Sequence, residues 1–142
     1  MRTVNVPDEF VRSIVSVISD MVDLLGKGKD LRLALGRAPE LQHLCRGMVD
    51  VAKDADTCFA FMILFDFIGV LSNWDGRTDG WYSLNAESVA DMKQKLKKYL
   101  ERLSDALQRK DYDAIVECTK DWVLDSHLLT SKVSRDVRAT AS

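Results

Sequence analysis

Cysteine and histidine are scarce in this sequence, and neither residue type occurs in a pattern that binds a metal. The three cysteines, Cys45, Cys58 and Cys118, are an odd number and form no CxxC pair and no Cys/His ligand spacing, which disfavours a structural zinc site. Each lies among apolar residues, where a free thiol packs as a small hydrophobic group. We therefore expect structural cysteines, and the sequence predicts no metal and no cofactor.

Local motifs of catalysis are also missing. The chain has no GxSxG nucleophile motif, no phosphate-binding loop and no dinucleotide glycine fingerprint. A catalytic triad assembles in space and leaves no contiguous pattern, yet no cluster of residues in this sequence requires a particular chemistry. The prediction is that the protein is not an enzyme.

Excess basic charge and a membrane-length apolar segment are absent as well. A formal net charge of −2 argues against a nucleic-acid partner, because such domains are usually strongly basic. The first ten residues show no secretory signal, which predicts a cytoplasmic location. The apolar run from Cys58 to Leu71, CFAFMILFDFIGVL, is shorter than the ~20 residues that cross a bilayer and contains Asp66. No membrane span is expected, and the run is predicted instead to be a buried central helix that supplies the core.

What the chain does have is the composition of one soluble helical domain. Its 142 residues are 46% apolar and 30% charged, a balance that suits a single hydrophobic core. Residues 1–125 are predicted to form one helical-bundle domain. After that point aromatic content and periodicity are lost, so residues 126–142 are predicted to be a loosely ordered C-terminal tail.

Apolar residues recur at spacings of three and four along most of the chain, which predicts an all-α fold. Four main helices are expected near residues 7–25, 39–52, 58–71 and 89–107, the first two beginning at prolines. A bend or break is favoured over one continuous helix near residues 53–57. We expect an antiparallel bundle of these four helices, with a short connecting helix after Asp30 and a C-terminal helix that closes one end.

The loop after the central helix supplies the predicted partner-binding residues. Trp74, Arg77, Trp81 and Tyr82 are of types enriched at binding hot spots. The alternative is that the aromatic residues pack the loop onto the end of the bundle. A calcium site is disfavoured, since Arg77 and Ala86 occupy positions where an EF-hand loop needs oxygen ligands.

Two polar residues are candidates for a pocket inside the bundle. Asp66 interrupts the central apolar run and Tyr99 lies on the apolar seam of the fourth helix. A buried carboxylate needs a partner, so Asp66 either pairs with a cation, acts in a pocket or points outward. A second hypothesis is therefore a small-ligand-binding protein or an enzyme with an internal pocket. Five cations on the fourth helix favour a solvated face over an anion site; they are Lys93, Lys95, Lys97, Lys98 and Arg102.

The leading prediction is a noncatalytic protein-protein interaction module, an adaptor or chaperone-like bundle, whose partner is another protein or a second copy held through helix faces. Residues 106–117, ALQRKDYDAIVE, follow a basic heptad helix in an acidic chain, and over its last third the sequence resembles bacterial flagellin export chaperones. That resemblance implies a bundle that clamps an unfolded protein segment along its helices. The resemblance identifies no individual binding residue in this chain.

Overall fold

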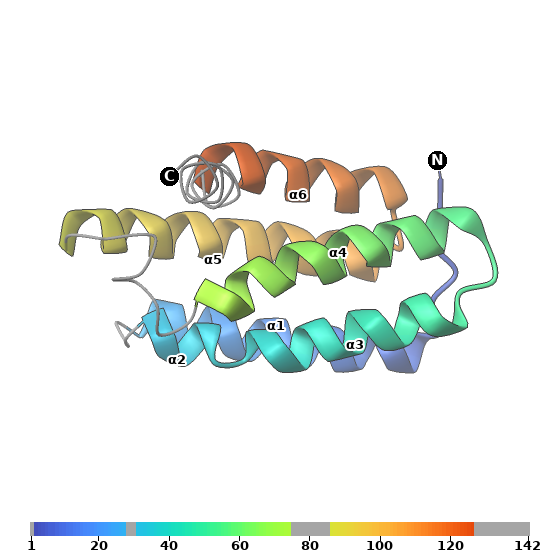
Figure 1. Ribbon diagram of the computed structural model, residues 1–142, viewed down its shortest axis with the longest axis horizontal. Helices are drawn as coiled ribbons and strands as arrows, with labels where there is room; N and C mark the ends of the chain where they lie inside the picture. The colour runs from blue at the N-terminus through green and yellow to red at the C-terminus, as the bar shows by residue number, and fades with distance from the viewer. Residues whose placement is uncertain (1, 28–30, 75–85, 127–142) are drawn as a thin grey trace, which may run out of the picture.

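The computed structural model describes residues 2–27, 31–74 and 86–126, and these residues are almost entirely helical (Figure 1). The helices are α1 (Asp8–Gly26), α2 (Leu31–Leu35), α3 (Ala38–Val51), α4 (Ala55–Trp74), α5 (Ala86–Gln108) and α6 (Tyr112–Ser126). The all-α prediction is confirmed. Within the described part, the only extended pairing is an isolated bridge between Thr3 and Asp111.

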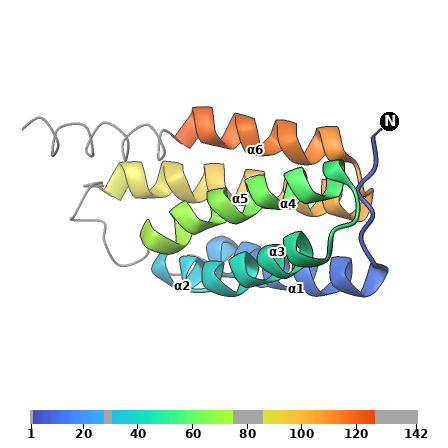
Figure 2. The same cartoon turned by 45° about the vertical axis from the view of Figure 1, so that its right-hand side comes forward.

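Five long helices surround one hydrophobic core. Each lies next to two others in the cyclic order α1, α3, α4, α6, α5 and back to α1, while α2 packs on α1 and α4. Figures 1 and 2 show that α4 and α6 run in the same direction and that the other neighbours in this cycle are antiparallel. The C-terminal helix α6 lies lengthwise on α4 and α5, so it is a fifth wall of the bundle and does not close one end as predicted.

The predicted break before the central helix is confirmed at residues 52–54, between α3 and α4. Asp54 caps α4, because its Oδ2 accepts a hydrogen bond of 3.0 Å from the Thr57 N–H. This bond holds the pKa of Asp54 below its ordinary value. The Thr57 hydroxyl, fully buried, accepts a 2.7 Å bond from the Asn5 N–H, so the N-terminal segment fixes where α4 begins.

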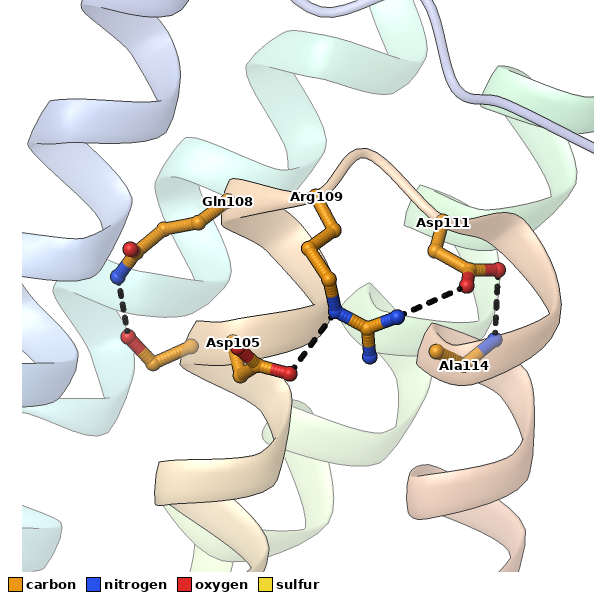
Figure 3. A network of polar contacts seen from close by, with 6 residues as sticks. Asp105, Gln108, Arg109, Asp111 and Ala114 are labelled. Atoms are coloured by element: carbon orange, nitrogen blue, oxygen red, sulfur yellow. Dashed lines mark hydrogen bonds and ion pairs between the residues drawn. The ribbon is translucent and has the colours of Figure 1, made fainter.

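The turn between α5 and α6 is held by a polar network (Figure 3). Arg109 donates to Asp105 at 2.9 Å and to Asp111 at 3.2 Å, and Asp111 accepts from the Ala114 N–H at 3.1 Å. Lys110 has a φ of 53°, the left-handed conformation that ends many helices. Because of this cap and turn, α6 folds back antiparallel to α5.

The first residues of the chain attach to that turn. The Val4 N–H donates to the Lys110 carbonyl at 3.0 Å, and the Tyr112 N–H donates to the Arg2 carbonyl at 3.0 Å. The Lys110 ammonium lies 2.6 Å from Asp8, at the N-terminus of α1, and its hydrogen bond lowers the pKa of that carboxyl. These contacts join the start of α1 to the end of α5.

Candidate functional site

Helix α4 is apolar on both sides, although only one side faces the core. Its inner face is buried, and includes Ala60, Phe61, Leu64, Phe67, Ile68 and Leu71. On the outer face Phe59, Met62 and Ile63 are 54%, 44% and 37% exposed. A helix that is apolar all round is normally buried on all sides, so the outer face of α4 is the feature that most needs a functional explanation.

Val51, the last residue of α3, is 62% exposed. It lies at the same end of the α3–α4 pair as the first turns of α4, because only residues 52–54 connect the two helices. We refer to Val51, Phe59, Met62 and Ile63 together as the apolar patch. Phe59, Met62 and Ile63 share one side of α4 by their spacing of three and four. Soluble monomers expose single apolar residues commonly, whereas neighbouring ones on one face indicate an interaction site.

A shallow hollow of about 290 Å³ adjoins the patch between α3 and α4. Its lining residues are Arg46, Val49, Asp50, Met62, Phe65 and Asp66. The Arg46 guanidinium lies 5.7 Å from the centroid of the Phe65 ring and its Nε lies 3.2 Å from Asp50. The hollow therefore has an apolar floor and charges of both signs at its rim, the arrangement of an interface core inside a polar border.

Close packing of α3 on α4 supports this surface from behind. A Cβ atom built on Gly69 would lie 2.7 Å from the Gln42 Nε2, so the absence of a side chain at Gly69 allows Gln42 to lie against the α4 backbone. Gln42 Nε2 donates to the Phe65 carbonyl at 3.5 Å. The two helices that carry the apolar patch and the hollow are thus closely packed at this point.

The structure separates the two predicted pocket residues. Asp66 is exposed at the rim of the α3–α4 hollow, which is the outward orientation that the sequence left open. Tyr99 is buried between α5 and α6, and its hydroxyl lies 2.9 Å from the Thr119 hydroxyl. Burial raises the pKa of Tyr99. The two side chains line different hollows and do not converge on one pocket.

The predicted partner-binding loop lies outside the described residues. Arg77, Trp81 and Tyr82 fall in the undescribed segment 75–85, and so does most of the calcium-like loop. Trp74 is the last residue of α4, and its side chain is not described. The predicted tail is also outside, beyond Ser126. These interpretations stay predictions.

Sequence reasoning missed the apolar patch because it assigned the whole run from Cys58 to Leu71 to the core. That assignment is wrong for Phe59, Met62 and Ile63. Spacings of three and four link these three residues to one another on one side of the helix, while Ala60, Leu64 and Phe67 are linked in the same way on the other. The sequence signal for the apolar patch was the presence of two apolar stripes on opposite sides of one helix. A chain of this size is too small to cover such a helix on every side.

Thiol reactivity offers a direct test of burial near the patch. Cys45 is fully buried, which raises its pKa to about 12, and burial also raises the pKa of Cys118. Cys58 is half-buried beside Met62, with the two sulfur atoms 3.8 Å apart. Since the thiolate is the reactive form, we expect iodoacetamide to modify Cys58 alone in the folded protein and all three cysteines in denaturant, as read by intact mass. A Cys58→Ser variant should show no native modification; rapid native labelling of Cys45 would contradict the fold.

Within the described ranges, no three His, Cys, Asp or Glu side chains gather where they could hold a metal ion. By length and composition alone, residues Ala55–Ser72 of α4 could cross a membrane, and 44% of this window is buried in the bundle. Core helices of soluble proteins meet the same criterion. The expectation of no membrane span stays a prediction.

Comparison of the chain with family models, with curated proteins and with solved structures finds no match. Functional inference for this protein therefore rests on its own residues.

Proposed function

We propose that this protein is a noncatalytic interaction module that holds an apolar helix of another polypeptide against its apolar patch. The observation that carries the proposal is the exposure of four large apolar side chains, between 37% and 62%, on the adjoining helices α3 and α4. Covering such side chains contributes about 25 cal/mol per Å² of apolar surface removed from water. A partner helix is the simplest cover, because helix-in-groove recognition places apolar anchors at spacings of three and four.

The rim of the hollow supports a protein partner over a lipid surface. Asp50 and Asp66 put carboxylates beside Met62 and Phe65, and carboxylates are repelled by the anionic lipids that attract basic surfaces. Arg46 provides the opposite charge at the same rim. Mixed rim charges set the orientation of a protein partner more than its affinity.

The test is a variant that makes the patch polar without disturbing the core. Phe59→Asp with Met62→Asp should leave the helical circular dichroism spectrum unchanged, since both side chains are more than two-fifths exposed. Fully burying one large apolar side chain is worth about 1.5–3 kcal/mol, so we expect the double variant to weaken partner binding at least tenfold. The matched control is Leu33→Asp on α2, whose side chain is 54% exposed, as that of Phe59 is, and lies outside the patch.

Two measurements read the result. Sedimentation over a range of concentrations reports whether the partner is a second copy, and affinity capture with quantitative mass spectrometry reports any other protein. Loss of association in the patch variant, with retention in the Leu33→Asp control, is the expected result. Equal association by both variants and the wild type would overturn the proposal. The resemblance to flagellin export chaperones stays a prediction about which proteins to examine as partners.

A further inference from the structure

A second recognition surface lies on the side of the bundle formed by α5 and α6. A cleft of about 360 Å³ opens between these two helices, a volume at the lower end of the range for small-molecule sites. Three cations of α5 line one wall, namely Lys95, Lys98 and Arg102. Two aromatic side chains and one exposed leucine supply the apolar surface, namely Tyr99, Trp122 and Leu124.

Two of the three cations are already engaged with neighbouring acceptors. Arg102 Nη1 lies 3.1 Å from Asp121 Oδ2, and Lys95 Nζ donates to the Asp125 carbonyl at 3.2 Å. Both contacts cross from α5 to α6. Lys98 lies between them in the sequence, about one helical turn from each, and within residues 2–27, 31–74 and 86–126 it makes no ion pair. Lys98 is thus a cation available to a ligand.

Two buried aromatic side chains line the cleft and stack on each other. The Tyr99 and Trp122 rings stack with centroids 5.5 Å apart and an interplanar angle of 7°, and both side chains are 3% exposed. Among the described residues, the buried Trp122 Nε1 has no hydrogen-bond acceptor, an unusual state for an indole N–H. Lys98 and Trp122 both line the cleft, and within the described residues Lys98 makes no ion pair and the buried Trp122 Nε1 has no acceptor.

We propose that this cleft binds a small amphipathic monoanion, a carboxylate on a short apolar chain. The cleft is lined by three cations and by two carboxylates, those of Asp121 and Asp125, so one negative charge balances it. The ligand carboxylate accepts from the Lys98 ammonium, and its apolar chain covers Leu124, which is 63% exposed. This site lies on α5 and α6 and is independent of the patch on α3 and α4.

The first experiment is titration of the intact protein with octanoate, followed by calorimetry and by the indole N–H resonance of Trp122 in ¹H–¹⁵N spectra. A Trp122→Phe variant assigns that resonance. We expect saturable binding that shifts the Trp122 signal and weakens with added salt, because an ion pair contributes. Octan-1-ol and octylammonium, which share the chain and lack the negative charge, should bind at least fivefold more weakly.

Matched lysine variants test the assigned cation. Lys98→Gln should weaken octanoate binding about three- to tenfold, in line with the loss of one charge-assisted hydrogen bond at a partly exposed site. Lys97→Gln, one residue away on the same helix and paired with Glu101 at 3.8 Å outside the cleft, should change it less than twofold. Equal affinity for octanoate and octan-1-ol, equal effects of the two lysine variants, or shifts confined to α3 and α4 would each overturn the proposal. To distinguish a lipid surface from a free acid in solution as the source of the carboxylate, the titration is repeated with oleate-containing phosphatidylcholine vesicles.

Discussion

Replacing Phe61 by alanine is expected to lower the free energy of unfolding by about 3–5 kcal/mol. Phe61 is fully buried at the centre of the inner face of α4, and its ring meets the Phe10 ring edge to face with centroids 5.8 Å apart. Alanine removes both the apolar surface and that aromatic pair, and leaves a cavity that rigid helices fill only in part. Since small domains are stable by about 5–15 kcal/mol in total, the variant should be near the limit of folding at 37 °C.

Phe59→Ala is the matched control for this loss. It makes the same chemical change two residues earlier on the same helix, where the side chain is 54% exposed, so its cost should be below about 1 kcal/mol. Urea unfolding followed by circular dichroism measures both variants. Similar losses for the two would mean that α4 is rotated relative to the orientation described above.

Replacing Trp122 by alanine should cost a comparable amount, about 3–5 kcal/mol. Trp122 joins α6 to the rest of the bundle, because its ring stacks on Tyr99 of α5 and meets Phe67 of α4 with centroids 6.5 Å apart. Alanine would remove contacts with two helices at once. Thermal unfolding of the variant should show a Tm lower by about 6–20 °C, given about 2–4 °C per kcal/mol for a domain close to 150 residues.

Trp122→Phe separates packing from hydrogen bonding at this position. The indole N–H has no acceptor among the described residues, so phenylalanine loses ring volume and no hydrogen bond. We expect a cost of about 1–2 kcal/mol, within the range for a moderate loss of core volume. A phenylalanine variant as unstable as the alanine variant would indicate that the N–H is satisfied and contributes to the fold.

Helix positions were predictable from the sequence because they depend on local patterns. The break before α4 follows from an Asp54 that caps the helix, together with a change from one apolar stripe to two. The seam of α5 was also predicted correctly, since Leu96, Tyr99 and Leu103 are all buried. Each of these sequence signals lies within a few residues of the helix end or helix face that it specifies.

The structural features that the sequence did not predict depend on contacts between segments that are distant in the chain. The Asn5 N–H bonds to Thr57, 52 residues away, and Tyr99 is satisfied by Thr119, which reaches it only because α6 folds back along α5. Periodicity identifies which residues share a face of a helix, and it does not say which face a neighbour covers. For that reason the outer face of α4 and the α5–α6 cleft became visible only in three dimensions.

The cyclic arrangement of the helices also orders events as the chain is made. Helices α3 and α4 are joined by three residues and can pair as soon as both exist, because closing a short loop costs little entropy. Helix α1 is the first to be synthesised, yet it packs most extensively on α5, which is made after two further long helices. Its stripe of Ile14, Ile18 and Met21, fully covered in the folded protein, therefore lacks its main partner until late in synthesis. During that interval the nascent chain presents at its first helix an apolar stripe that the finished bundle buries.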